Sequence, residues 1–173
     1  MSQHTFMATD SDSVAAAADK LNQGRTFGQH SLQRFMYVLT TYWFLFWFLN
    51  GLDKFFNYPH FFGVTRDQKF IKYFATLDLP PFVALVSLYA VGILEVLLGI
   101  SFLVGLLLLH RTRKITLVNL ELSLFIFLGF SIADILFGDR KELWEHGTYI
   151  VLIIISYLST LLIARELPQN LKK

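Results

Sequence analysis

Hydrophobic residues in this chain gather in four long segments that are separated by shorter polar ones. The apolar segments span residues 34–52, 81–109, 115–138 and 147–164. At a rise of 1.5 Å per residue, each can cross a hydrocarbon layer of about 30 Å if the residues at its ends reach toward the headgroups. The pattern therefore predicts an all-α protein, with a bundle of four transmembrane helices over residues 34–165.

The connection between the first two apolar segments, residues 53–80, has a pattern of its own. Large apolar residues recur there at helical spacing beside basic ones: Phe70, Ile71, Tyr73, Phe74 and Leu77 with Arg66, Lys69 and Lys72. An apolar face and a basic face on one short helix are typical of a helix that lies in the membrane interface. We therefore predict an interfacial helix here, before Pro80 and Pro81, which suit the start of the second span.

Both ends of the chain are polar, and the basic residues indicate on which side they lie. Residues 1–33 form a polar N-terminal segment. Its sequence is compatible with two alternatives, a short helix capped by Ser11, Asp12 or Ser13 and a mobile tail. With the C-terminal tail, 166–173, the basic loop HRTRK, and Arg34 and Arg165 at the adjoining ends of the spans, this side of the bundle carries nine of the 15 lysine and arginine residues. Because cytoplasmic segments carry the excess of positive charge, we expect a plasma- or inner-membrane protein with both termini in the cytoplasm.

Composition agrees with a membrane protein and removes several classes of chemistry. Hydrophobic residues fill 54% of the 173 positions and charged residues only 16%, against about 25% in soluble domains. The chain has no cysteine, which excludes disulfide exchange, thiolate catalysis, iron–sulfur clusters and cysteine-based zinc sites. A formal net charge of +2 is too small to predict binding to nucleic acid.

The second apolar segment has one charged residue, Glu95, near its middle. A carboxylate at that depth costs several kcal/mol, so it is expected to face the bundle interior or to serve a function. At 100° per residue, Gly92 and Gly99 share the helix face of Glu95, and small residues there permit close approach of another helix. We therefore predict that Glu95 points into the bundle. Its role stays open between a proton-exchanging or ligand-binding carboxylate and a structural acid that fixes helix packing.

Three further ionisable residues fall at one end of the predicted bundle. Lys54 follows the first span, Asp134 lies about one turn before the end of the third, and His146 precedes the fourth. Helices that run up and down place these side chains at similar depth, with Glu95 deeper. The sequence thus predicts a structural polar cluster of Lys54, Glu95, Asp134 and His146. Within it we expect an ion pair between Lys54 and Asp134, with two separate interfacial charges as the alternative.

Residues that could hold a common cofactor are scarce. Bis-histidine haem ligation requires two imidazoles at one depth, but His110 and His146 lie at opposite ends of the predicted helices. The chain has no HExxH motif and no glycine-rich phosphate loop, so no metal site and no catalytic residue is predicted. No cofactor is identifiable. A quinone or a lipid stays open as a ligand, with Glu95, His146 and Tyr149 as candidate contacts.

Several short motifs along the chain resemble those of a known family. In chain order they are GLDKF at 51–55, GILE at 92–95 followed by Gly99 and Gly105, GD at 138–139, and EH at 145–146. In this order, over roughly residues 35–165, the chain resembles the DoxX-like superfamily of small four-helix integral membrane proteins. The resemblance implies that Glu95 is the family's glutamate and that Lys54 is its first-helix lysine.

What the resemblance implies about function is broad. Members of the superfamily are similar to the small subunit of an archaeal thiosulfate:quinone oxidoreductase, and others are partners in membrane oxidoreductase complexes. A eukaryotic relative is an assembly chaperone for ligand-gated channels. This chain differs from them in its long polar N-terminus and its aromatic-rich first loop, and it lacks the cysteines of the redox-relay relatives.

From these features we expect a non-catalytic accessory or assembly subunit of a larger membrane complex, respiratory or otherwise engaged in electron transfer. Its partners would be membrane lipids and other membrane-protein subunits, or a second copy of the chain. The first alternative is a quinone-linked oxidoreductase subunit of the DoxX/DoxD type, with Glu95 as the proton acceptor. A membrane assembly chaperone is the second alternative, and a small-solute transporter ranks last because the sequence shows no repeat.

Overall fold

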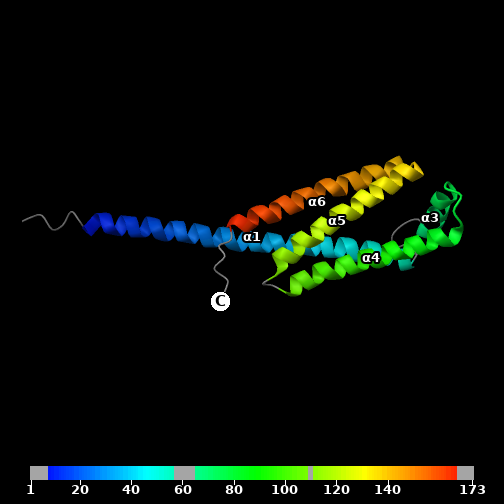
Figure 1. Cartoon of the computed structure of the whole chain (residues 1–173). Coiled ribbons are helices and arrows are strands. Elements are labelled where there is room, and N and C mark those ends of the chain that lie inside the picture. The colour runs from blue at the N-terminus through cyan, green and yellow to red at the C-terminus, as the bar shows by residue number, and fades with distance from the viewer. Residues whose placement is uncertain (1–7, 57–64, 109–110, 167–173) are drawn as a thin grey trace, which may run out of the picture.

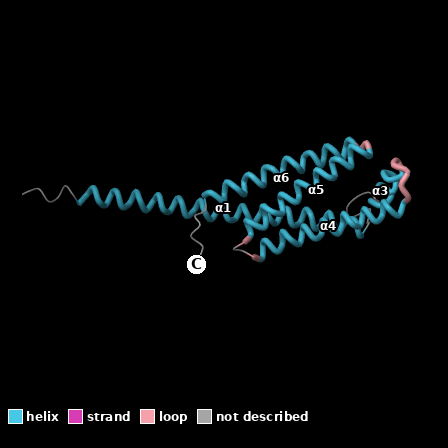
Figure 2. Tube along the Cα trace, in the orientation of Figure 1, coloured by secondary structure: helices cyan, strands magenta, loops and turns pink. Residues whose placement is uncertain are grey.

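In the computed structural model, residues 8–56, 65–108 and 111–166 are described, and every regular element among them is an α-helix. The helices are α1 (Ala8–Phe56), α3 (Arg66–Ala75), α4 (Pro81–Leu107), α5 (Thr112–Phe137) and α6 (Arg140–Glu166). Figure 1 shows the short α3 at one end of the long helices, and Figure 2 shows a short turn between α5 and α6. The predicted all-α class is confirmed.

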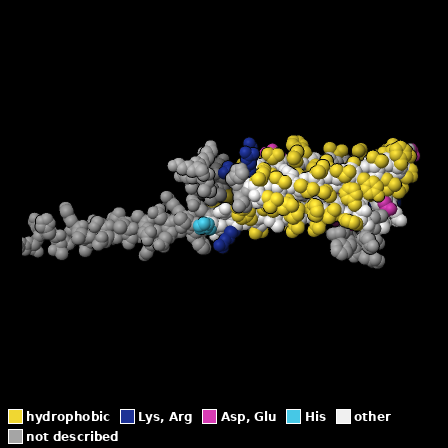
Figure 3. All heavy atoms as spheres, turned by 90° about the horizontal axis from the view of Figure 1, so that it is seen from below, with side chains coloured by type: hydrophobic (Ala, Val, Ile, Leu, Met, Phe, Trp, Pro, Cys, Tyr) yellow, Lys and Arg dark blue, Asp and Glu magenta, His cyan; other side chains and the backbone are white. Residues whose placement is uncertain are grey.

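Four of the described helices are long and apolar enough to cross a membrane. The candidate spans are His30–Phe56 within α1, Pro81–Leu107, Thr112–Phe137 and Arg140–Ile163. Figure 3 shows hydrophobic side chains covering the visible face of the bundle along its length, with charged side chains near its two ends. By length and composition, these helices indicate an integral membrane protein with several spans.

The four long helices form two antiparallel pairs. α1 packs along α4 and α5 packs along α6, while contacts between α4 and α5 and between α1 and α6 join the pairs (Figure 1). The end of the bundle that holds α3 and the turn from α5 to α6 is called the α3 end below. The opposite end, where α4 passes into α5, is called the α4–α5 end.

The first helix is longer than the sequence predicted. α1 continues without a break from Ala8 to Phe56, so the predicted boundary between a polar segment, 1–33, and the first span matches no change in the backbone. Figure 1 shows the first half of α1 extending beyond the other long helices. Residues 1–7 and 167–173 lie outside the described part of the chain, so the expected tails there stay predictions.

The last helix begins earlier than predicted, at Arg140 instead of at about residue 147. Gly138 adopts a left-handed conformation, with φ of 73°, and ends α5. The Asp139 side chain then accepts hydrogen bonds from the backbone N–H groups of Lys141 and Glu142, both at 3.1 Å. These are the bonds of an N-terminal cap, which allows charged residues to form the first turn. The polar stretch that looked like a loop is therefore the start of α6.

The short helix α3 lies where the sequence places an amphipathic helix. It packs along α4, and the rings of Tyr73 and Phe74 lie 5.2 and 5.4 Å from the ring of Phe137 at the end of α5. Leu77, which was included in the predicted apolar face, lies beyond the end of the helix. The location of α3 in a membrane interface stays a prediction.

Glycines permit the close packing of α1 against α4. A Cβ atom added to Gly99 would lie 2.7 Å from the backbone nitrogen of Phe48, and one added to Gly51 would lie 2.7 Å from Val96. Neither position can accept a larger side chain unless the helices separate. The predicted close approach on the Glu95 face of α4 is therefore confirmed. A core of large side chains fills the bundle between this contact and the other helices: Trp43, Trp47, Leu98, Phe102, Leu120, Phe127 and Ile153.

Candidate functional site

A buried ion pair joins α1 to α4 near the α3 end. Lys54 Nζ lies 2.5 Å from Glu95 Oε2 and also donates to the backbone carbonyl of Asn50 at 3.3 Å. The lysine and glutamate side chains are 8% and 4% exposed, so Glu95 points into the bundle as predicted. The predicted pairing of Lys54 with Asp134 is wrong, because α1 is packed along α4 and the ammonium meets the carboxylate of that helix first.

Asp134 is paired with His146 instead. A hydrogen bond of 2.5 Å joins Asp134 Oδ2 to His146 Nδ1 across the turn between α5 and α6. The imidazole also lies 5.6 Å from the Phe127 ring and 5.3 Å from the Phe130 ring. The early start of α6 places His146 in its second turn, opposite the last turn of α5. A hairpin of two adjacent helices would have favoured this pairing, but the sequence does not show which helices are neighbours.

A third pair, which the sequence did not predict, joins the end of α1 to the start of α3. Arg66 Nε donates to Asp53 Oδ2 at 2.9 Å, and Asp53 is only 5% exposed. All three pairs lie toward the α3 end of the bundle. The only available signal was that Asp53 precedes Lys54, and this did not reveal its partner.

A second group of contacts, called the α3 tether below, fixes α3 to the start of α6. Lys69 Nζ lies 2.5 Å from Glu142 Oε1 and 3.3 Å from Asp139 Oδ2. The Tyr73 hydroxyl donates a hydrogen bond to the Asp139 carboxylate. Lys69 and Tyr73 are one helical turn apart, so both side chains leave α3 on the face that meets the turn. Sequence analysis placed Lys69 on the polar face of an interfacial helix and gave it no partner.

The ionisation of the tether follows from its contacts. Burial alone would raise the pKa of Asp139, but hydrogen bonds from Tyr73, the Glu142 backbone and Lys69 outweigh it and hold this pKa at about 2. Burial alone would lower the pKa of Lys69, yet its bond to Glu142 raises it above the ordinary value. Burial, together with the bond to Asp139, raises the pKa of Tyr73. At neutral pH the tether is therefore an ionised Lys69 and Asp139 beside a neutral phenol.

Uncharged polar groups connect the helices toward the α4–α5 end. The hydroxyls of Thr40 and Thr116 lie 3.0 Å apart, and Trp43 Nε1 donates to Ser156 Oγ at 3.1 Å. Ser101 Oγ donates to Asn119 Oδ1 at 2.9 Å. Among the described residues, the buried Nε1 of Trp47 and Nδ2 of Asn119 have no hydrogen-bond partner. In an apolar surrounding, hydrogen bonds between side chains of different helices set the rotation of each helix about its axis.

Two shallow grooves of about 370 Å³ lie on the surface, and neither is lined by the three candidate ligand contacts, Glu95, His146 and Tyr149. The Tyr149 ring is packed 5.2 Å from the Phe127 ring, against the same phenylalanine as His146. The structure thus brings His146 and Tyr149 together on α6, while Glu95 is occupied by Lys54 on the other helix pair.

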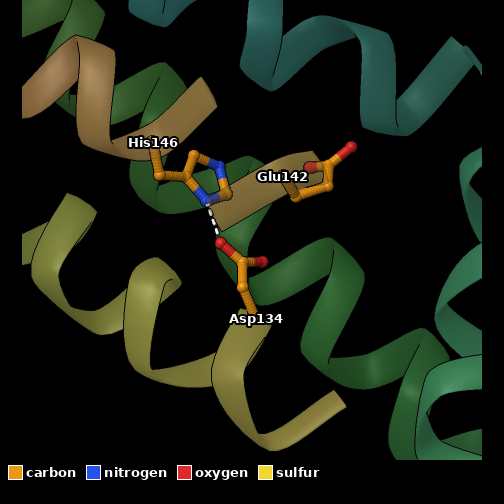
Figure 4. A group of neighbouring side chains, drawn as sticks. All are labelled: Asp134, Glu142 and His146. Carbon is orange, nitrogen blue, oxygen red and sulfur yellow. Dashed lines mark hydrogen bonds and ion pairs between the residues drawn. The ribbon is translucent and has the colours of Figure 1, made fainter. Parts of the chain in front are cut away.

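One group of side chains at the α3 end has the composition of a metal site. Asp134, Glu142 and His146 each offer a donor atom, and these atoms lie within 4.8 Å of one another. Figure 4 shows Asp134 approaching the imidazole of His146, with Glu142 beside them on α6. The sequence predicted no metal site, because the three residues match no known motif and Glu142 was assigned to a loop.

No protein-family model matches this chain, and no curated protein or solved structure matches it either. The fold and the site therefore define its class: an α-helical protein in which four of the described helices are long and apolar enough to span a membrane, with a buried lysine–glutamate ion pair near one end. The resemblance to the DoxX-like superfamily rests on the motifs in the sequence and stays a prediction.

Proposed function

We propose that the chain is a non-catalytic accessory or assembly subunit of a larger membrane complex. One observation carries the proposal: the buried carboxylates at the α3 end are each bound by a partner within the chain itself. Glu95 is bound by Lys54, Asp134 by His146 and Asp53 by Arg66. A carboxylate that exchanges protons with a substrate needs access to it, whereas charges closed on one another act as fixed links between helices.

The outward faces of the helices are also compatible with a subunit of a larger assembly. Large apolar side chains on all four long helices are more than half exposed, among them Phe82 on α4, Phe125 on α5 and Trp144 on α6. These faces suit lipid and the helices of other subunits equally, because both are apolar. An electron-transfer complex is our choice among membrane complexes, on the basis of the DoxX-like motifs.

Co-purification in mild detergent tests the proposal. Membranes of the source cells that express the full chain with a small affinity tag would be solubilised gently, and captured proteins would be quantified against the chain. We expect at least one membrane protein at a constant ratio that survives a second, orthogonal purification step. A chain that is recovered alone, folded and of uniform size would contradict the proposal.

Two open glycines allow the contact face to be mapped. A Cβ added to Gly129 on α5 or to Gly147 on α6 meets nothing within 4 Å. Because there is space for the Cβ atom at both positions, we expect Gly129→Leu and Gly147→Leu to retain the packing of the chain. Loss of the partner with Gly147→Leu alone would place the partner on α6, and loss with Gly129→Leu alone would place it on α5. Retention with both variants would direct the search to α1 and α4.

A quinone-linked oxidoreductase subunit is the second candidate function, and the pairing of Asp134 with His146 favours it. A carboxylate that orients an imidazole is a common arrangement for moving a proton. The hypothesis that Glu95 is the proton acceptor of such a subunit is tested by the variant Lys54→Met/Glu95→Leu, which removes both members of the buried ion pair. Loss of quinone-linked turnover in membranes that hold normal amounts of the folded variant supports it. Unchanged turnover removes Glu95 from the mechanism.

A further inference from the structure

The turn between α5 and α6 gathers three acidic side chains. Asp134, Asp139 and Glu142 converge there, and the Lys69 ammonium from α3 contacts the last two. His146 completes the group through its bond to Asp134. The side chains of Asp134, Glu142 and His146 are 9%, 24% and 16% exposed, so they are sheltered but can be reached from the α3 end.

We propose that Asp134, Glu142 and His146 form a binding site for a divalent transition-metal cation. The three donor atoms come from two helices, within 4.8 Å of one another (Figure 4). Glu142 and His146 are four residues apart on α6, a spacing that presents both side chains on one helix face. Asp134 enters from the last turn of α5, so the cation would link the two helices where they turn.

Small side-chain movements are enough to bind a cation. Ligands at about 2.0–2.2 Å from a tetrahedral zinc ion lie about 3.4 Å from one another. The oxygen of Asp134 and the nitrogen of His146, now 2.5 Å apart, would separate by about 1 Å, and Glu142 would turn toward them. The helix backbones need not move, because Glu142 lies in the first turn of α6 and is partly exposed.

Lys69 competes with the cation for Glu142. Its ammonium lies 2.5 Å from Glu142 Oε1, so it supplies one of the positive charges that a bound cation would supply. Because Lys69 also contacts Asp139 at 3.3 Å, it can keep that partner while it releases Glu142. Binding would therefore exchange one bond of the α3 tether for the cation. The site and the position of α3 are linked through this one side chain.

The donor set selects the class of cation. One imidazole nitrogen with two carboxylate oxygens suits zinc and other first-row divalent cations, whereas magnesium and calcium prefer oxygen ligands alone. Three protein ligands also leave a tetrahedral ion with one position for water. We therefore choose Zn²⁺ as the probe and Mg²⁺ as the comparison.

The test is titration calorimetry of the full chain in detergent with ZnCl₂, after purification through a tag that contains no histidine. We expect one saturable Zn²⁺ site per chain and no comparable heat with MgCl₂. Glu142→Gln and His146→Gln should each weaken binding at least about tenfold, since the loss of a supporting residue alone typically costs 10–100-fold. Lys69→Gln should strengthen binding several-fold, because it removes the competing charge.

The controls separate loss of the site from loss of the fold. Glu145→Gln changes an exposed carboxylate on the same helix, and His30→Gln removes an exposed imidazole on α1; both should bind as the wild type does. The gain with Lys69→Gln cannot arise from misfolding. The proposal is overturned if the wild-type chain has no saturable site, if binding is indifferent to Glu142 and His146, or if Lys69→Gln weakens it.

Discussion

Lys54 and Glu95 are 41 residues apart in the sequence, yet the ammonium of the first lies 2.5 Å from the carboxylate of the second. Lys54 lies near the end of α1 and Glu95 near the middle of α4. Neither charge has more than a tenth of its side chain exposed, so each is compensated chiefly by the other. The pair fixes the rotation of α1 relative to α4, because turning either helix would leave a charge buried without a partner.

Breaking this pair on one side should be costly, whereas removing both members should not. Glu95→Leu and Lys54→Met are each expected to lower the free energy of unfolding by about 3 kcal/mol or more. The variant Lys54→Met/Glu95→Leu should recover most of that loss, because no unpaired charge stays buried. Unfolding in mixed micelles, followed by circular dichroism, measures the cycle. Additive effects of the two substitutions would show that the residues do not interact.

The exposed pair Lys141 and Glu145 provides the control for that cycle. Their atoms are 4.0 Å apart, and the side chains are 88% and 53% exposed. Solvent screens such a pair, so Glu145→Gln should change the free energy of unfolding by less than about 0.5 kcal/mol.

Close packing of α1 against α4 predicts that Gly99→Ala destabilises the bundle by about 1–3 kcal/mol. The added Cβ would lie 2.7 Å from the backbone of Phe48, which can move only if the helices separate. Gly129→Ala is the matched control, since its Cβ meets nothing within 4 Å and alanine favours the helix. Thermal unfolding in detergent compares the two variants. Equal melting temperatures would contradict the close contact.

The α3 tether predicts a local effect of Tyr73→Phe. This change keeps the ring against Phe137 but removes the hydroxyl that donates to Asp139, so a loss of about 1 kcal/mol is expected. Hydrogen exchange in α3 should become faster while exchange in α4 stays the same. Tyr89→Phe serves as the control, because Tyr89 is 43% exposed and stacks on Phe55. Unchanged exchange in α3 with Tyr73→Phe would show that the hydroxyl does not hold the helix.

The hydrogen bond between Trp43 and Ser156 predicts the effect of Ser156→Ala. The indole N–H of Trp43 would be left buried without an acceptor, at a cost of about 1–3 kcal/mol. Unfolding in mixed micelles measures this loss, and Ser159→Ala on the same helix should cost less than about 0.5 kcal/mol. A neutral result for Ser156→Ala would mean that water or another group satisfies the indole.

The absence of cysteine makes the predicted topology directly testable. Thr76→Cys places a thiol at the exposed α3 end, and Lys114→Cys places one at the exposed α4–α5 end. If the excess of basic residues faces the cytoplasm, a membrane-impermeant maleimide added to intact cells should label Thr76→Cys alone. Labelling of Lys114→Cys alone would show that the orientation is the opposite of the predicted one.

Sequence alone determined which segments are long helices and which of their faces are buried. An apolar run of about 20 residues has few alternatives to a helix that crosses a membrane, because its backbone must satisfy its own hydrogen bonds. A 3.6-residue period puts Thr40, Trp43, Trp47 and Lys54 on one face of α1, and each of these residues is less than a tenth exposed. Glu95 was placed in the interior by the same reasoning. It shares a helix face with Gly92 and Gly99, and such small residues permit another helix to pack closely.

Helix boundaries at polar junctions were less accessible to sequence analysis. The residues after Gly138 are charged, which favoured a loop. The sequence did not show that the Asp139 side chain would cap the first turn of a helix there. The error placed His146 before the helix and left Glu142 outside it. As a result, the group of Asp134, Glu142 and His146 was not foreseen, although all three residues are adjacent in the structure.

The tertiary structure alone decided which charges meet. Lys54, Glu95, Asp134 and His146 were all assigned to one cluster, but Lys54 is bound to Glu95 and Asp134 to His146. Periodicity predicts on which face of its own helix a residue lies, but it does not predict which neighbouring helix that face contacts. The contact depends on which helices pack closely. The glycines of α1 and α4 allow the backbones of these two helices to approach, and this brings Lys54 to Glu95.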